Sequence, residues 1–541
     1  MTFRRLAILL GLLAAAVYWF GLIADVMEID AAQYAAMSRE MSQTHGYLQV
    51  KHRGRNYLDK PPALFWASSA SFQILGVGNV SYKLPSFLFS LLGLFSVFGF
   101  GRRLFDRKTG LIAAAMLACS QAFIYINNDV RTDTILAGAV IFAIWQFTEW
   151  LAEDRLVNLV LGAAGIAAAM LAKGPIGLMV PVLAIGSYML WRRDARLLLR
   201  PHWITAFLVV ALLLAPMLWG LYHQYGWRGW RFYFWTQSFG RITGESSWRD
   251  NSGGLFFVHT FLWAFLPWSC AAGYAAFDGI KRLWRDRMKR ECAAEAMLLG
   301  GSILPFIALS FSHYKLPHYI FVFFPLVAVL TARFCIMIAG NVPGPGNRYR
   351  VFAWIQQSQS VLLWIFGFCL LTLVFPTGNP ALWLAAFALC AATIVLMRKQ
   401  PPLRTLIVPS MVAILGVNLL LNAHFFPHLL AYQANAVAGK RAESLHARIF
   451  GFKKGGHALD FYARRIVPMI METGELRDSL DRGPALVYLT KEGLNEIREA
   501  GLKPAWVDSM ESFKVSRATL KFLLASSRSK VLRWNFLAAF E

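Results

Sequence analysis

Charged residues are scarce in this chain of 541 residues: Asp, Glu, Lys and Arg make up 16% of it, and 57% of the residues are hydrophobic. Soluble proteins usually contain about 25% charged residues. Internal repeats and low-complexity linkers are also missing. Because the apolar residues form long blocks, the composition excludes a soluble enzyme, a disordered protein and a collagen-like fibre. It predicts an α-helical polytopic membrane protein.

Acidic residues are few as well: there are 30 of them against 54 lysines and arginines, which gives a formal net charge of +24. In a membrane protein, Lys and Arg collect on cytoplasmic loops and beside lipid headgroups. The basic excess therefore predicts contacts with membrane lipids, and we expect no nucleic-acid partner.

Only 6 cysteines occur, and no CxxC pair or regular spacing links them. This pattern predicts neither a disulfide framework nor a zinc cluster. We expect the cysteines to be buried small hydrophobic residues.

Apolar runs of about 17 to 25 residues can cross a bilayer as helices, and the chain contains about 13 of them. They cover approximately residues 6–24, 80–101, 110–127, 134–151, 157–173, 175–191, 203–222, 255–278, 294–312, 317–339, 353–376, 380–397 and 404–424. The first run follows Arg4 and Arg5, as in a signal peptide. Since it is long and no A-x-A site closes it, we expect a retained helix.

The short loops after the second, sixth, eighth and twelfth runs are rich in Lys and Arg, and they fall on the same side as the N-terminus. The positive-inside rule makes this side cytoplasmic. An odd number of spans then places the C-terminal region on the opposite face. We therefore predict a multi-pass protein of a bacterial inner membrane, with a cytoplasmic N-terminus and a periplasmic C-terminal region.

Two domains are expected. Residues 1–425 would form the transmembrane domain, with long outer loops at 25–79 and 223–254. Residues 426–541 alternate helical stretches with apolar runs such as 485–489, bounded by Gly and Pro. That alternation predicts a small periplasmic α/β domain.

Two segments of the first outer loop are predicted to be helices that lie in the outer membrane interface. Residues 31–44 place Tyr34, Met37 and Met41 at helical spacing on one face. The segment 61–77 is too short and too polar to span the bilayer comfortably.

Basic residues also occur at the outer membrane edge, where the positive-inside rule disfavours them. They are Lys60, Lys173, Arg241 and Lys315. An anionic group at the headgroup level would explain their position, and a lipid-linked phosphate or pyrophosphate is the obvious candidate.

Asp30 and Asp133 lie at the same edge in two different segments. Two converging carboxylates can share acid–base chemistry, or one of them can bind a sugar hydroxyl or a divalent metal. Structural alternatives exist for each residue. Asp30 could cap the helix that it precedes, Asp133 could pair with Arg131, and Lys60 and Lys173 could be snorkelling lysines.

Six short motifs stand in an order that resembles the lipid-linked-sugar glycosyltransferases of the GT-C fold. They are Asp30-x3-Tyr34, Asp59-Lys60-Pro61-Pro62, Lys83-Leu-Pro85-Ser86, Arg131-Thr-Asp133, Ala172-Lys173-Gly174-Pro175-Ile176-Gly177 and Lys315-Leu316-Pro317-x-Tyr319. The branch that looks most similar is that of the bacterial aminoarabinose transferase of lipid A, kin to the dolichyl-phosphate-mannose protein mannosyltransferases. The resemblance covers residues 1–425 by motif order and predicted spans.

This resemblance implies a donor sugar on a polyprenyl phosphate, such as undecaprenyl phosphate, and an acceptor that is lipid A, a protein or another glycan. It places the family's essential aspartate at Asp30 and its lysine at Lys60. The other positions that it implies are Tyr34, Tyr57 and Tyr319 in the cavity and Asp133 as a second acidic group. Gln237 and Ser238 stand where relatives often have Glu-His, and this departure argues against a metal site at that position.

We therefore expect an inverting hexosyl- or pentosyltransferase in which Asp30 acts as the base. The cations Lys60, Lys173, Arg241 and Lys315 would stabilise the phosphate leaving group. A divalent metal is the one possible cofactor, although His313 and His318 are too few and too scattered to predict a metal site by themselves.

Other functions fit parts of this pattern. A transporter or flippase of an anionic or polyprenyl-linked lipid would also need charges in a membrane cavity, but it predicts ionisable residues deep in several spans. A ligase that moves a whole glycan from a pyrophosphate carrier would share the fold. The aromatic residues of 223–241 fit an interfacial belt as well as a sugar-stacking platform.

Overall fold

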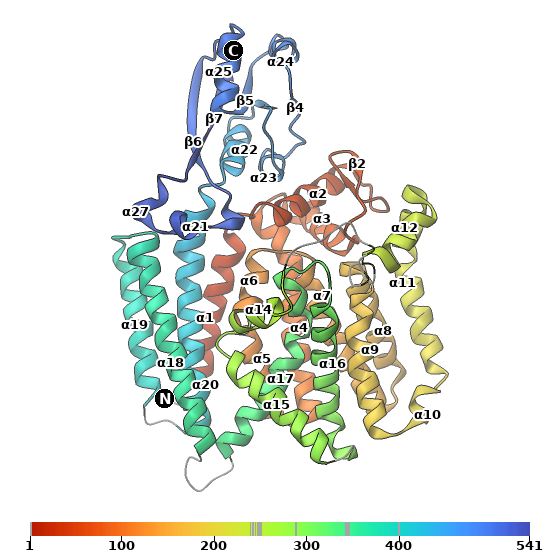
Figure 1. Cartoon of the computed structure of the whole chain (residues 1–541). Helices are drawn as coiled ribbons and strands as arrows, with labels where there is room; N and C mark the ends of the chain where they lie inside the picture. The colour runs from red at the N-terminus through yellow and green to blue at the C-terminus, as the bar shows by residue number, and fades with distance from the viewer. Residues whose placement is uncertain are drawn as a thin grey trace.

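The computed structural model describes residues 3–237, 240, 243, 245, 252–286, 289–340, 347–398 and 401–541. Long helices run side by side in a bundle, and a smaller domain stands on one end of it (Figure 1). Within the described residues, 9 helices are long and apolar enough to span a bilayer. The elements that carry them are α1 (Phe3–Ile23), α4 (Asn79–Leu104), α7 (Thr132–Glu153), α8 (Leu156–Lys173), α10 (Ala195–Leu198) with α11 (His202–Tyr225), α16 (Ala293–Ser310), η3 (Pro317–Phe323) with α17 (Phe324–Gly340), α18 (Asn347–Cys369) with η4 (Leu370–Val374), and α20 (Pro402–Leu420) with η5 (Leu421–Phe425) and α21 (Phe426–Leu430).

Four further apolar segments coincide with predicted spans but are short or bent. α9 (Ile176–Arg192) and α19 (Pro380–Leu396) have 17 residues each. The other two are bent pairs: α5 (Arg107–Ala118) with α6 (Gln121–Asn128), bent by 53°, and α14 (Phe256–Ala264) with α15 (Ser269–Arg285), bent by 118°. If each pair counts as one span, the described residues hold up to 11. The figure of about 13 crossings stays a prediction.

The predicted spans 110–127 and 255–278 are bent pairs of helices, and their two breaks contact each other. The N–H of Gln121, which opens the second half of one pair, donates to the carbonyl oxygen of Leu266 in the break of the other pair (3.0 Å). Pro267 follows Leu266 and has no N–H to continue a helix.

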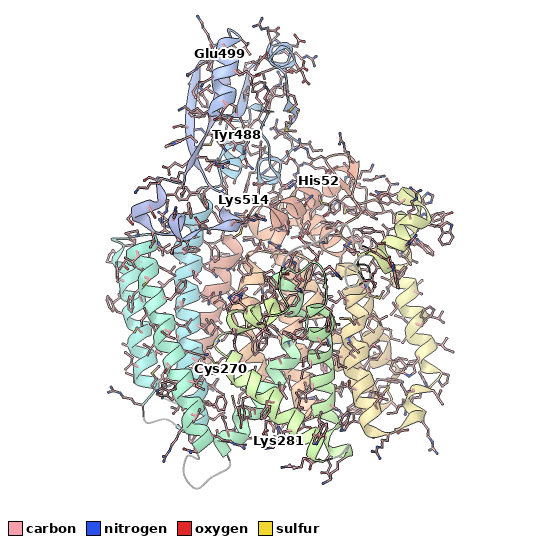
Figure 2. The ribbon with its side chains drawn as sticks, viewed as in Figure 1. His52, Cys270, Lys281, Tyr488, Glu499 and Lys514 are labelled. Carbon is pink, nitrogen blue, oxygen red and sulfur yellow. The ribbon has the colours of Figure 1, made fainter. Side chains whose placement is uncertain are left out.

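The N-terminus and the C-terminal domain lie at opposite ends of the bundle (Figure 1). Lys281, which belongs to one of the predicted basic loops, lies at the N-terminal end, whereas His52 and Lys514 lie at the other end (Figure 2). The fold thus separates this basic loop from the C-terminal domain. The assignment of the two ends to cytoplasm and periplasm stays a prediction.

Glycines allow α4 to pack closely against α5 and α7. A Cβ atom on Gly101 would lie 2.8 Å from the Cα of Gly110 in α5, and one on Gly138 in α7 would lie 2.2 Å from the carbonyl oxygen of Phe89. Small residues let helix backbones approach closely in a membrane, where van der Waals packing drives association. This packing fixes the position of α7, whose first turn carries Asp133.

The cysteines differ in burial. Cys119 and Cys335 are buried, whereas Cys270 is exposed on α15. Cys292, Cys369 and Cys390 are partly exposed. The expectation that all six are buried therefore holds for Cys119 and Cys335 alone.

The segment between α1 and α4, predicted to be the first outer loop, contains α2 (Asp30–Thr44), the hairpin of β1 (Lys51–His52) and β2 (Arg55–Asn56), and α3 (Ala63–Leu75). Both predicted helices are present, but α2 does not expose a polar face at the membrane interface. Its Arg39 is only 1% exposed, and Glu40 is buried as well. The reason is that α23 (His457–Tyr462) of the C-terminal domain packs against α2.

The C-terminal domain is a mixed sheet with helices, which confirms the predicted α/β fold. The strand order is β4-β3-β5-β7-β6. β3 is parallel to β4 and β5, and β7 is antiparallel to β5 and β6. The strands are β3 (Arg448–Phe452), β4 (Met469–Ile470), β5 (Ala485–Thr490), β6 (Trp506–Ser512) and β7 (Arg533–Phe540), and the other helices are α22 (Ala434–Ser444), α24 (Thr473–Leu480), α25 (Lys491–Glu499), α26 (Leu520–Leu523) and α27 (Ala525–Arg528).

Candidate active site

Asp30 opens α2, and its side chain is held by Arg131. Nη1 of Arg131 donates to Oδ2 of Asp30 (2.7 Å), and Nε of the same guanidinium donates to Oδ2 of Asp129 (3.1 Å). The hydroxyl of Tyr125 donates a further bond to Asp129 (3.0 Å). In the part of the chain that the structure describes, Asp30 makes no hydrogen bond to the N–H groups of α2. The interpretation of Asp30 as a helix cap is therefore wrong.

The charge of Arg131 is secured by its partners. Burial alone would lower the pKa of Arg131, but the carboxylates of Asp129 and Asp30 raise it above its usual value. The side chain of Asp129 is 2% exposed, whereas that of Asp30 is 40% exposed. Arg131 is thus anchored on a buried carboxylate and orients an accessible one. Such a carboxylate can accept a proton or bind a hydroxyl group.

Two tyrosines lie beside Asp30. Tyr34 is one turn further along α2, and Tyr57 follows β2, where its hydroxyl donates to Oδ2 of Asp59 (3.5 Å). Burial raises the pKa of both tyrosines, and the nearby carboxylates raise it further. Both hydroxyls therefore keep their protons at neutral pH and can donate to sugar or phosphate oxygens.

Lys60 lies in the same loop and is partly buried. Its Nζ donates to Oδ2 of Asp59 (2.7 Å). The carboxylate of Asp59 therefore accepts hydrogen bonds from both Lys60 and Tyr57. This ion pair replaces the interpretation of Lys60 as a snorkelling lysine.

A second group of polar residues connects α7 and α8. Lys173, the last residue of α8, donates to Oδ1 of Asp133 in the first turn of α7, and both side chains are largely buried. Nζ of Lys173 also lies 4.4 Å from the ring centroid of Tyr319, and Nε2 of His318 lies 3.8 Å from Oδ2 of Asp133. Asp133 therefore pairs with Lys173, so the predicted alternatives of an Asp133–Arg131 pair and a snorkelling Lys173 are wrong.

The motif around Lys173 is a tight turn between two helices. Gly174 has a φ of +76°, which suits glycine, and its N–H donates to the carbonyl oxygen of Met170 (2.7 Å). A Cβ atom on Gly177 would lie 2.5 Å from the backbone carbon of Ala169, so α8 and α9 touch directly after the turn. The turn presents Lys173 at the end of the bundle.

The two groups meet at the segment 131–133, where Arg131 binds Asp30 and Asp133 binds Lys173. The predicted residues that the structure places in these groups are Asp30, Tyr34, Tyr57 and Lys60 in the first and Asp133, Lys173 and Tyr319 in the second. Lys315 is buried just before η3, which contains Tyr319, and its Nζ donates to the carbonyl oxygen of Ser252 (3.0 Å). Arg241 lies outside the described residues.

Three residues with clear roles were not selected as site residues from the sequence. Arg131 and Asp129 form the centre of the first group; their position two residues apart at the outer end of a span was the available signal. Lys83 has a positioning role, because its Nζ donates to the carbonyl oxygens of Gly21 (2.9 Å) and Ala24 (2.8 Å). A cation stabilises the C-terminal end of a helix. Lys83 stabilises the end of α1 in this way, a few residues before Asp30.

An apolar groove opens beside this site, between α8, α9 and α11. Its volume is about 520 Å³, and apolar side chains line it almost completely. Met170, in the last turn of α8, and Phe234 line the groove near the C-terminal end of α8. The carbonyl oxygen of Met170 accepts a hydrogen bond from the hydroxyl of Tyr233 (3.0 Å), and Tyr233 lines a small cavity together with Tyr57 and Lys60. The groove, which opens on the surface of the bundle, therefore has one end near the charged site.

No three His, Cys, Asp or Glu side chains converge as metal ligands among the described residues. Asp30 and Asp133 are the site carboxylates that could hold a divalent cation. A possible divalent metal stays a prediction.

Comparisons with known proteins point in one direction. Residues 59–219 match the family described as dolichyl-phosphate-mannose-protein mannosyltransferase. The undecaprenyl phosphate-alpha-4-amino-4-deoxy-L-arabinose arabinosyl transferase of Erwinia tasmaniensis is 27% identical over 63% of this chain and 61% of its own length. The enzyme of the same name from Pseudomonas aeruginosa is 27% identical over 54% and 52%. The chain thus matches somewhat more than half the length of these curated relatives.

Solved structures share the fold over most of the chain. The crystal structure of ArnT from Cupriavidus metallidurans bound to undecaprenyl phosphate has a TM-score of 0.74 at 18% identity, and the match covers 99% of this chain and 98% of that one. The archaeal oligosaccharyltransferase AglB from Archaeoglobus fulgidus has a TM-score of 0.50 at 13% identity, over 91% and 70%. Together these findings support the resemblance drawn from the motifs: the chain has the fold of ArnT, and its sequence is similar to the bacterial aminoarabinose transferases and, over residues 59–219, to the dolichyl-phosphate-mannose-protein mannosyltransferase family.

Proposed function

We propose that the chain is an inverting membrane glycosyltransferase. It moves a single sugar from a polyprenyl phosphate, such as undecaprenyl phosphate, to an acceptor that is lipid A, a protein or another glycan. In this proposal residues 1–425 carry the reaction, residues 426–541 form a periplasmic domain, and the site faces the periplasm of a bacterial inner membrane. The observation that supports it most is the meeting of a charged site with an apolar groove at one end of the bundle.

The groove suits the prenyl chain of the donor, and the charged site suits its phosphate and sugar. A prenyl chain needs an apolar channel that opens to the headgroup level, where the phosphate charge lies. Tyr34, Tyr57 and Tyr319 would orient the sugar or the phosphate through their hydroxyl groups.

The proposed reaction is an in-line displacement at the anomeric carbon. Asp30 accepts the proton of the acceptor hydroxyl. The oxygen of that hydroxyl attacks the anomeric carbon at the same time, and the bond between the anomeric carbon and the lipid phosphate breaks. Negative charge then grows on the leaving phosphate, and fixed cations stabilise that charge more in the transition state than in the ground state. The candidates for these cations are Lys60, Lys173, Lys315 and Arg241.

Transfer from a polyprenyl-phosphate sugar by Asp30→Asn and Lys60→Ala variants tests this assignment. We expect each variant to lose transfer by at least about 100-fold, the range for a lost general base or a lost electrostatic contact. Lys51→Ala, which changes an exposed lysine of the same loop, should transfer at the wild-type rate. Because Asp30 and Asp133 could also hold a divalent metal, each assay is run with and without a chelator.

Near wild-type transfer in both site variants would reject the assignment. Movement of the donor lipid between leaflets, with no transfer to any acceptor, would favour the flippase instead.

Filling the groove tests the place of the prenyl chain. Ala211 lines the groove on α11, so Ala211→Trp should raise KM for a long-chain donor about tenfold, the effect of about 1.4 kcal/mol of lost binding. A donor analogue with a short prenyl chain should be unaffected. Ala15→Trp on the exposed face of α1 is the matched control.

A further inference from the structure

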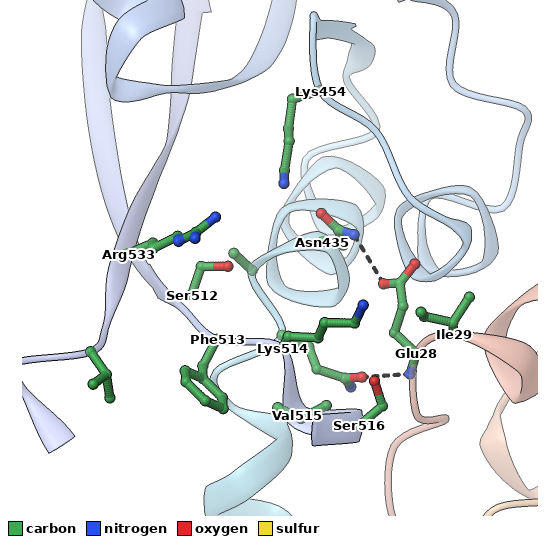
Figure 3. Close-up of a pocket in the computed structure, with 13 residues that line it drawn as sticks. Glu28, Ile29, Asn435, Lys454, Ser512, Phe513, Lys514, Val515, Ser516 and Arg533 are labelled. Atoms are coloured by element: carbon green, nitrogen blue, oxygen red, sulfur yellow. Dashed lines mark hydrogen bonds between the residues drawn. The ribbon is translucent and has the colours of Figure 1, made fainter. Parts of the chain in front are cut away.

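A second polar cavity lies at the seam between the helix bundle and the C-terminal domain. Its volume is about 410 Å³, within the range of about 300–1,000 Å³ that is usual for ligand pockets. The segment before α2 lines it, together with the start of α22, the loop after β3 and the segments that flank β6 and β7 (Figure 3). We call this cavity the seam pocket.

Three cationic side chains reach into the seam pocket from separate segments. They belong to Lys454 after β3, Lys514 after β6 and Arg533 at the start of β7 (Figure 3). Within the described residues, none of these side chains makes a hydrogen bond or an ion pair. The hydroxyl groups of Ser512 and Ser516 add further donors to the lining.

Glu28 is the acidic residue of this pocket, and its carboxylate is already engaged. Oε2 accepts a hydrogen bond from Nδ2 of Asn435 (2.9 Å), and Oε1 accepts one from the N–H of His457 (2.8 Å). Both oxygens thus face the C-terminal domain. Counting Lys454, Lys514 and Arg533 against Glu28 leaves a formal charge of +2 in the lining.

We propose that the seam pocket binds a phosphate monoester carried by the acceptor. A phosphate monoester bears between one and two negative charges at neutral pH and offers three strong acceptor oxygens. Arginine binds such oxygens in a bidentate manner, lysines bind them as point charges, and hydroxyls donate to them. This chemistry matches the charge and the donors of the lining better than a carboxylate, which carries one charge.

The pocket's place in the molecule connects it to the reaction. The N–H of Glu28 donates to Oε1 of Gln433 (2.6 Å), Gln433 also lines the pocket, and Asp30 follows only two residues later. Lys514 marks the level of the pocket at the end of the bundle (Figure 2). A membrane-anchored acceptor whose phosphate sits in the seam pocket would therefore present another part of itself beside Asp30. This step rests on the proposed function, whereas phosphate binding itself does not.

Binding to the full-length protein tests the proposal without any transfer reaction. The probes are N-acetylglucosamine 1-phosphate, N-acetylglucosamine and inorganic phosphate, measured by calorimetry in detergent. A parallel arm uses nanodiscs that contain phosphatidic acid, a monoester, or phosphatidylglycerol, a diester. We expect the sugar phosphate to bind more tightly than inorganic phosphate, and unphosphorylated sugar not to bind.

The variant Lys454→Gln/Lys514→Gln/Arg533→Gln should weaken binding of the phosphate monoester at least tenfold. A charge-matched control, Lys491→Gln/Arg498→Gln/Lys503→Gln, changes three exposed cations outside the pocket and should bind as the wild type does. Lys514→Gln alone should give a smaller loss, which guards against misfolding of the triple variant. Asp30→Asn should bind normally, so that failure of the proposed reaction and failure of the pocket are separated.

Equal binding by the wild type and the triple variant would overturn the proposal, and so would inorganic phosphate that binds as tightly as the sugar phosphate. A preference for phosphatidic acid over phosphatidylglycerol that the triple variant loses would assign the phosphate to a lipid headgroup. If the sugar phosphate binds and phosphatidic acid is not preferred over phosphatidylglycerol, the phosphate belongs to the sugar part of the acceptor.

Discussion

Two polar regions meet at residues 28–30, and their charges are arranged differently. In the candidate active site, the four carboxylates of Asp30, Asp59, Asp129 and Asp133 face the three cations of Lys60, Arg131 and Lys173 in direct pairs. In the seam pocket, three cations face one carboxylate that is hydrogen-bonded elsewhere.

The charges of the candidate active site are balanced within the protein, whereas those of the seam pocket are balanced only when an anionic ligand binds. Paired charges hold each other in place, so the candidate active site is preorganised before any substrate binds, and removal of one partner leaves a buried charge uncompensated. Cations without partners gain little from the folded state, and an anionic ligand completes their environment. Substitutions should therefore cost stability in the first region and ligand binding in the second.

Removal of Arg131 should have the largest effect. Arg131→Met leaves the carboxylate of Asp129 buried without its cation and frees Asp30. We expect the free energy of unfolding to fall by about 3–5 kcal/mol and transfer to be lost. Lys514→Gln in the seam pocket should change stability by no more than about 0.5 kcal/mol. Thermal unfolding in detergent and a transfer assay measure both effects.

A double variant separates stability from activity at this position. Arg131→Met/Asp129→Asn should recover most of the lost stability, because no unpaired buried charge remains. Transfer should stay low, since Asp30 still lacks the guanidinium that orients it. If Arg131→Met were as stable as the wild type, or if Lys514→Gln lost as much stability as Arg131→Met, the two regions would not differ in the way proposed.

The second largest effect should come from a glycine that touches the loop of Tyr57 and Lys60. A Cβ atom on Gly220 of α11 would lie 1.8 Å from the carbonyl oxygen of Leu48, so the loop backbone has to move. Overpacking of this kind costs about 1–3 kcal/mol. We expect Gly220→Ala to lower transfer at least about tenfold, because a shift of about 1 Å at a positioned group is costly.

Gly11→Ala on α1 is the matched control, because a Cβ atom there meets nothing within 4 Å. Alanine is the better helix former, so this variant should be as stable as the wild type or slightly more stable. Normal transfer by Gly220→Ala would show that the position of the loop does not limit the reaction.

Much of this architecture follows from local sequence patterns. Apolar runs locate most of the spans, because a bilayer demands a fixed length of apolar helix. The alternation of helical and apolar stretches predicted the α/β fold near 485–489. Lys60 and Lys173, which lie outside the basic loops predicted for the N-terminal side, marked the end of the bundle that carries the charged site.

The ion pairs of the site and the packing of the C-terminal domain on α2 could not be predicted in this way, because tertiary packing decides them. Arg131 and Asp30 are 101 positions apart, and Asp133 has a cation two residues away yet pairs with Lys173, 40 positions away. Similarly, the amphipathic pattern of α2 gave no sign that a later domain would cover Arg39. A helix pattern reports which residues share a face and says nothing of what packs on it.

The last effect, a gain of stability and not a loss, should appear at the contact between α2 and the C-terminal domain, which joins the two regions. Asp460 is buried there, 3.1 Å from Nη1 of Arg53. Burial raises the pKa of Asp460 from 3.8 to about 6, more than its hydrogen bond and Arg53 lower it. The folded state therefore favours the protonated carboxyl. This contribution is fully present below about pH 3.8 and is lost as the pH rises through about 6.

Asp460→Asn imitates the protonated carboxyl at every pH. The variant should therefore match the wild type near pH 4 and become more stable by roughly 1–3 kcal/mol above pH 6. His52 and His457 also titrate near this contact, with pKa values lowered by burial, but they are common to both proteins and cancel in the difference. The midpoint of thermal unfolding between pH 4 and 8 measures this difference in stability between the variant and the wild type. Asp481→Asn, which changes an exposed carboxylate, is the control. If the variant were less stable at pH 7, the ion pair with Arg53 would outweigh the cost of burial, and the charge pairing of the candidate active site would extend into the C-terminal domain.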